Sequence, residues 1–154
     1  MLGTDHPDTI DSINGLARSY QLQEKYSDAV IQYQRCLAKR TLVLGASHED
    51  TLDTMRALAD TYDFLGMYSE AEPLLEECLA KQRLVLGESH QDTLRTMNNL
   101  GDAYRNQGNC IQAEKLYREC LAKQKLVLGD NDPQTILTMI GLSIIESMAR
   151  SAKK

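Results

Sequence analysis

The stretch ECLAKQRLVLGESHQDTL, at residues 77–94, decides the fold because closely similar versions of it occur three times in the chain. The other versions, RCLAKRTLVLGASHEDTL and ECLAKQKLVLGDNDPQTI, begin at residues 35 and 119, so the period is 42 residues. A fixed period between about 20 and 50 residues is typical of stacked repeat proteins. The sequence therefore predicts a single repeat domain over residues 1–154, with units at 2–43, 44–85 and 86–127 and a half unit at 128–154.

Each unit is predicted to contain two helices. Apolar or small residues recur at helical spacing, in unit one at Ile10, Ile13, Leu16, Ala17 and Tyr20 for the first helix and at Ala29, Tyr33, Cys36 and Leu37 for the second. Gly66 and Gly108 suit the left-handed turn between the two helices of a unit, where unit one has Glu24. The half unit keeps Ile136, Met139 and Leu142 in the core columns. The prediction is an all-α solenoid of antiparallel helix hairpins with about seven helices.

Composition narrows the class of partner. The net charge is −5 and both signs are mixed along the chain, which argues against nucleic acid or an anionic membrane as the main partner. The sequence has neither a long apolar run nor the basic start of a signal peptide. We expect a soluble, cytoplasmic protein. Because the start at Leu2 and Gly3 lies inside a linker between units, we also expect the chain to be a piece of a longer array.

The histidines and cysteines are predicted to be structural. His6, His48 and His90 share one column before the first helix of each unit, and Asp132 takes that column in the half unit. Because Asp is a preferred N-cap, we expect the column to cap helices. Equivalent positions in stacked units lie too far apart to share a metal ion. Cys36, Cys78 and Cys120 are expected to be buried and reduced. No cofactor, metal or enzyme activity is predicted.

The stretches LGTDHPDTI, EAEPLLEECLAK and TMNNLGDAYRNQG resemble the tetratricopeptide repeat (TPR), and the 42-residue unit resembles its kinesin light chain-like subclass. This resemblance implies a right-handed superhelical solenoid that acts as a protein-interaction scaffold. It also implies a peptide-binding groove lined by the first helices, with Asn14, Arg18, Arg56, Asp60, Phe64, Arg95, Asn98, Asn99, Asp102 and Arg105 as its lining residues. The predicted partner is a protein or linear peptide.

Two other functions stay open. One is a structural spacer or oligomerisation module within a longer repeat protein, and a less favoured one is an RNA-binding helical repeat. The half unit supports the oligomerisation role. At the positions that line the groove in the other units it has the apolar residues Leu137, Ile140, Ile144 and Met148. A terminal repeat normally turns a polar face to water. We therefore expect this apolar stripe to mediate self-association, most simply as a homodimer through the C-terminal helix, or to accept the next unit of a longer array. The alternative is a terminal helix that shifts to bury its own stripe.

Overall fold

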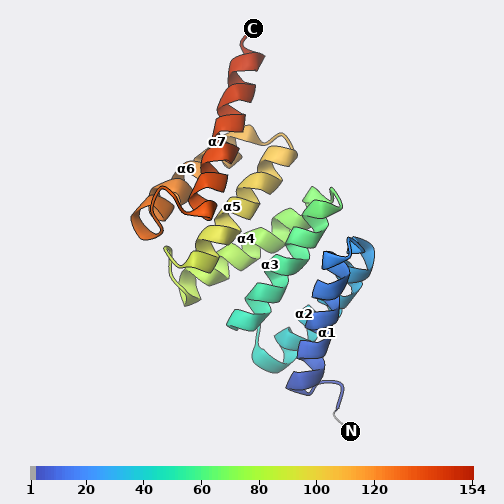
Figure 1. The fold of residues 1–154 in the computed structure, drawn as a ribbon. Helices are drawn as coiled ribbons and strands as arrows, with labels where there is room; N and C mark the ends of the chain where they lie inside the picture. The colour runs from blue at the N-terminus through green and yellow to red at the C-terminus, as the bar shows by residue number, and fades with distance from the viewer. Residues whose placement is uncertain (1–2) are drawn as a thin grey trace. The chain divides into compact units, whose positions relative to one another are not determined.

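The computed structural model describes residues 3–154, and within that range it contains seven α-helices and no strand (Figure 1). The helices are α1 (Pro7–Leu22), α2 (Tyr26–Leu44), α3 (Glu49–Phe64), α4 (Tyr68–Val85), α5 (Gln91–Asn106), α6 (Cys110–Val127) and α7 (Pro133–Ala152). The predicted division into two helices per unit and one in the half unit is confirmed. Leu2, where the first unit begins by period, lies outside the described residues.

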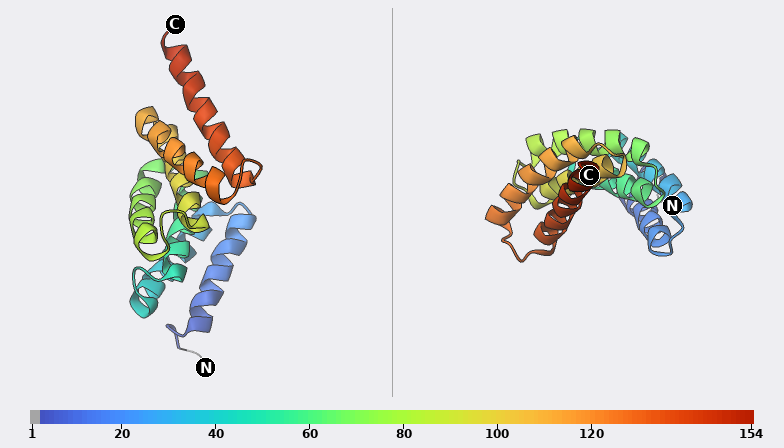
Figure 2. Two further views of the ribbon diagram at one scale, coloured as in Figure 1. Left: turned by 90° about the vertical axis from the view of Figure 1, so that its left-hand side faces the viewer. Right: turned by 90° about the horizontal axis from the view of Figure 1, so that it is seen from above.

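The chain forms two compact halves that divide at Lys81 and Gln82. The N-terminal half holds α1, α2, α3 and most of α4, and within it α2 packs against both α1 and α3. The C-terminal half holds the end of α4 together with α5, α6 and α7. Of these, α5, α6 and α7 pack against one another. In this half, α7 runs past the ends of α5 and α6, so its last turns project into solvent (Figures 1 and 2).

The turns between paired helices confirm the expected left-handed backbone. The residues at this position are Glu24, Gly66 and Gly108, with φ angles of 60°, 71° and 83°. A side chain is strained in this conformation and glycine is not. The turn between α1 and α2 therefore has the same conformation as the other two turns, although Glu24 is less suited to it than glycine.

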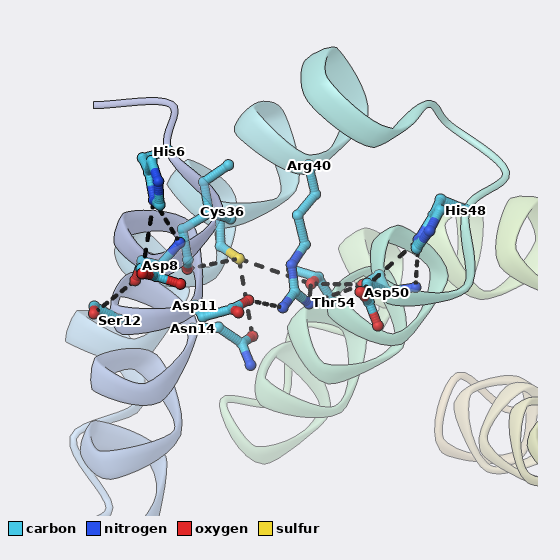
Figure 3. Close-up of polar contacts among 11 residues, drawn as sticks. His6, Asp8, Asp11, Ser12, Asn14, Cys36, Arg40, His48, Asp50 and Thr54 are labelled. Atoms are coloured by element: carbon cyan, nitrogen blue, oxygen red, sulfur yellow. Dashed lines mark hydrogen bonds and ion pairs between the residues drawn. The ribbon is translucent and has the colours of Figure 1, made fainter. Parts of the chain in front are cut away.

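The histidine column caps the first helices, as predicted. In His6, His48 and His90 the Nδ1 atom accepts a hydrogen bond from the backbone N–H two residues later, at 3.2, 3.1 and 3.1 Å. Figure 3 shows the first two of these caps. Asp132 does the same for α7 through Oδ1, which accepts from the N–H of Gln134 at 2.9 Å. These bonds satisfy one of the free donors that every helix N-terminus carries.

Each second helix is fastened to its first helix by a buried cysteine. The Cys36, Cys78 and Cys120 thiols donate to the carbonyl oxygens of Ile10, Leu52 and Leu94, at 3.8, 3.4 and 3.2 Å. Burial raises the pKa of Cys36, and it raises the pKa of Cys120 to about 12. A thiol with a raised pKa is a poor nucleophile and a poor metal ligand. The prediction of buried, reduced cysteines is confirmed for this column.

Three predicted core residues at the chain ends are exposed instead. Leu16 on α1 is 43% exposed, although the equivalent Leu58 on α3 is buried. Ile136 and Met139 on α7 are 42% and 41% exposed, whereas Leu52 and Met55 pack against Cys78 of α4. The reason is the same in each case. No described helix precedes α1 or follows α7, so the side chains that would cover these columns are missing.

Tyr117 of α6 lies between two glycines of neighbouring helices. The tyrosine is completely buried, and a Cβ atom added to Gly101 of α5 would lie 2.6 Å from its ring. A Cβ atom added to Gly141 of α7 would lie 2.8 Å from the same ring. Contacts this short require something to shift. The close packing of α5, α6 and α7 therefore depends on both glycines.

The first prediction concerns the histidine caps. His48→Ala should lower the free energy of unfolding by about 1 kcal/mol because the N–H of Asp50 loses its acceptor. His48→Asp should restore most of that loss, since Asp132 already performs this role for α7. Urea unfolding of the two variants measures both effects. Equal destabilisation by Ala and Asp would show that the imidazole ring stabilises α3 by something other than capping.

The second prediction uses two glycines of the same repeat column. Gly141→Ala should destabilise the fold by about 1 to 2 kcal/mol, because crowding of Tyr117 outweighs the better helix propensity of Ala. Gly15→Ala should stabilise it by about 0.5 to 1 kcal/mol, since nothing lies within 4 Å of its added Cβ. Thermal unfolding compares the two. In a Tyr117→Leu background Gly141→Ala should cost less stability, because the clash with the tyrosine ring is relieved. If Gly141→Ala destabilises this background as much as it destabilises the wild type, the clash is ruled out.

Candidate binding surface

The first helices α1, α3 and α5 carry the ten residues predicted to line a peptide-binding groove, and we call them the first-helix surface. Arg18 and Phe64 are exposed, and the other eight, Asn14, Arg56, Asp60, Arg95, Asn98, Asn99, Asp102 and Arg105, are half-buried. The N-terminal half holds the first five by number and the C-terminal half the last five. All ten are therefore within reach of solvent, but their interactions differ.

On α3 the arginine is neutralised by its own helix. Arg56 donates to Asp60 at 2.9 Å and to Asp53 at 2.8 Å, one turn to either side. With both sides of its guanidinium group engaged, Arg56 presents little positive potential to a partner. Phe64, at the end of the same helix, stacks on Tyr26 of α2 with ring centroids 5.0 Å apart and leaves 59% of its surface exposed. This stack offers a partner a flat apolar contact.

On α1 the acidic residue Asp11 also has a partner within the chain. Arg40 of α2 donates to Asp11 of α1 at 2.9 Å and to the hydroxyl and carbonyl oxygens of Thr54 and Asp50 on α3, at 2.8 and 2.9 Å (Figure 3). The Arg40 side chain is only 8% exposed. One buried guanidinium group thus joins α1, α2 and α3. Asp11 is already bonded to this group. Asn14 lies one turn further along α1, with its Oδ1 3.9 Å from the Cys36 sulfur.

On α5 the polar residues form a network that reaches the next two helices. Asp102 accepts from Tyr117 of α6 at 2.5 Å, from Asn98 at 3.2 Å, and pairs with Arg105 at 3.1 Å. The carbonyl oxygen of Asn98 accepts from Thr138 of α7 at 2.8 Å. Asn98 and Asp102 therefore position helices, and removing either would loosen the C-terminal half as well as any ligand contact.

Arg18 and Arg95 differ from the other cations of this surface. Within residues 3–154, neither guanidinium group makes a hydrogen bond or an ion pair. Burial raises the pKa of Tyr33, and the nearby Arg18 charge offsets part of that rise. An arginine without a protein partner can donate in a bidentate way to a carboxylate. These two side chains are the groups best suited to hold an acidic partner.

The apolar stripe of α7 is open, as expected from the sequence. Leu137, Ile140, Ile144 and Met148 are 58%, 51%, 41% and 45% exposed. The adjoining side of the helix, formed by Thr135, Thr138, Gly141 and Ile145, is buried. The stripe begins beside α5, because Thr138 bonds to Asn98.

Sequence reasoning missed the polar groups inside the helix stack. Arg40 and the buried threonines 51, 54, 61, 93, 96, 135 and 138 were read as neither core nor site. A signal was present, because threonine recurs at 9, 51, 93 and 135 with the 42-residue period. The equivalents of Arg40 are Gln82 and Gln124, which are also buried. No group of histidine, cysteine and acidic residues that could hold a metal ion occurs in the part of the chain that the structure describes.

The third prediction tests the buried guanidinium group. Asp11→Ala should destabilise the fold by about 1 to 2 kcal/mol, less than for a fully buried pair because Asp11 is 68% exposed. In an Arg40→Gln background, where Gln matches residues 82 and 124, the same change should cost less than about 0.5 kcal/mol. Chemical unfolding of the four chains gives the coupling free energy. Additive effects would mean that the Arg40–Asp11 bond contributes nothing to stability.

Comparison with known protein families identifies the repeat. Two tetratricopeptide repeat family models match the chain, one over residues 9–50 and 93–134 and the other over residues 33–83. No curated protein sequence matches it. Among the described residues, no helix is long and apolar enough to cross a membrane.

Three solved structures are similar in fold. The nearly identical TPR-like repeats assigned to a kinesin light chain of Podosopora anserina share 26% identity at a TM-score of 0.83, covering 99% of this chain and 72% of that one. BtubC (BKLC) from P. vanneervenii shares 22% at 0.85, covering 94% and 58%. The Sgt2 TPR domain from Aspergillus fumigatus shares 16% at 0.70, covering 96% and 83%.

Proposed function

This chain belongs to the tetratricopeptide repeat family, a scaffold fold that generally mediates protein–protein interactions, and we propose that the first helices of each compact half, taken by itself, bind an acidic peptide or protein segment. The observation that carries the proposal is the state of Arg18 and Arg95, whose guanidinium groups have no partner within residues 3–154. A guanidinium group without a protein partner gains from a carboxylate, because no intramolecular ion pair has to be broken first.

The rest of the surface supports a short linear ligand. The stacked Phe64 and Tyr26 rings supply an apolar contact in the N-terminal half. In the same half, Asn14 carries an amide group that can bond the backbone of an extended segment. An enzyme activity has no support in this arrangement, and neither does a polyanion such as RNA, because Arg56 and Arg105 are already paired with acids of their own helices.

The fourth prediction concerns ligand selection. Peptides selected from a random display library on the purified chain should be enriched in Asp and Glu. Arg18→Ala and Arg95→Ala, tested as separate variants, should each weaken the peptides that bind its own half of the chain by about 10- to 100-fold, since a hydrogen bond between charged groups contributes about 1.5 to 3 kcal/mol. Calorimetry measures the affinities.

The matched control is Lys115→Ala, which removes an exposed cation from the second helix α6. It should leave the affinity unchanged. Equal loss in the control and the arginine variants would show non-specific attraction of acidic peptides. Selection of neutral peptides that ignore both arginines would contradict the proposed surface.

A further inference from the structure

We propose that two copies of this chain associate through α7, packed side by side in antiparallel orientation about a two-fold axis at the middle of the helix. This inference does not rest on the proposed peptide binding, because it uses a different set of side chains. It rests on three observations: a continuous apolar stripe, the position of that stripe on the helix, and the charges at the two helix ends.

The stripe is continuous along one side of α7. Leu137, Ile140, Ile144 and Met148 occupy neighbouring directions on a helix with about 100° between residues, and Ile136 extends the stripe at its N-terminal end. Ser143 and Ser147 flank it, and both are exposed. Small side chains beside an apolar row allow another helix to approach closely. The stripe therefore has the form of one side of a helix pair.

The position of the stripe favours a second copy of the same helix. The midpoint of α7 falls between Leu142 and Ser143, and the stripe from Leu137 to Met148 has the same midpoint. A two-fold axis through this point places Leu137 level with Met148 of the second copy, and Ile140 within one residue, about 1.5 Å along the axis, of Ile144 of the second copy. Each of these four apolar side chains thus has an apolar neighbour in the second copy, which is the self-complementarity that a two-fold interface needs.

The charges at the helix ends favour the antiparallel direction. Asp130 and Asp132 precede α7, and Arg150, Lys153 and Lys154 lie at its C-terminal end. In the antiparallel register Lys153 lies at the level of Asp132 of the second copy, whereas a parallel pair would bring like charges together. Opposed helix dipoles add to the same preference.

The surface is accessible, and its size sets the expected strength. The last turns of α7 extend past α5 and α6, and every residue from Glu146 to Lys154 is exposed (Figures 1 and 2). A 20-residue helix is about 30 Å long and roughly 10 Å wide, so the contact is smaller than a standard protein interface. We therefore expect a dissociation constant on the order of 10 to 100 μM rather than a tight dimer.

The experiment that tests this inference has two arms. In the first, sedimentation equilibrium of the full chain from about 5 to 500 μM should show a monomer–dimer equilibrium within that range. Ile140→Ser with Ile144→Ser should weaken the association at least about tenfold. Leu126→Ser on α6 is the matched control, because Leu126 is 89% exposed and lies outside the stripe. A wild-type monomer at the highest concentration overturns the proposal, and so does a control that weakens association as much.

The second arm tests the direction of pairing and leaves most of the stripe intact. In a Cys110→Ser background, which removes the half-buried cysteine outside the core column, Leu137→Cys and Met148→Cys should form a disulfide-linked dimer when mixed under mild oxidation. Neither should do so alone, because its own counterpart lies about 16 Å away along the helix pair, beyond disulfide reach. Cross-linking of either variant alone, or no cross-linking of the mixture, overturns the antiparallel arrangement.

Discussion

The close contact between a cysteine and a backbone carbonyl is the constraint on which each hairpin depends. The sulfur atoms of Cys36, Cys78 and Cys120 lie within 3.8 Å of a first-helix carbonyl oxygen in each of the three units. A larger side chain would hold the two helices apart, and a charged one would be buried without compensation. The 42-residue period repeats this contact, so the same separation between paired helices recurs along the chain.

Most of the fold could be predicted from the sequence because it depends on local signals that recur. The caps at His48 and Asp132 and the turn at Gly66 are set by neighbouring residues, so periodicity revealed them. The wrong predictions of burial concern the first and last described helices, which have no further helix packed on one side. Leu16 and Ile136 fit the core pattern of their helices and are exposed, because no described helix covers that side. Periodicity describes a helix but does not say whether a neighbour is present.

The candidate surface could be predicted in position but not in its chemistry. All ten predicted residues are on first helices and none is fully buried, since register alone places them. Which of them are available to a partner depends on bonds between helices, such as Asn98 to Thr138 and Tyr117 to Asp102. Those bonds join residues 15 to 40 positions apart. No short motif encodes them, so Arg56 and Arg95 looked equivalent although only Arg95 is unpaired.

The packing of Tyr117 against Gly101 and Gly141 limits how freely the repeats can be exchanged. In the preceding unit the column of Tyr117 holds Leu75, and the columns of Gly101 and Gly141 hold Ala59 and Asn99. A gene duplication that copied unit three alone would carry Tyr117 and Gly101 but not the matching Gly141, which belongs to the next unit. The packing unit around Tyr117 is therefore not the 42-residue repeat. It is a set of three helices that crosses the repeat boundary, so exchange of a single repeat would separate Tyr117 from one of its glycines.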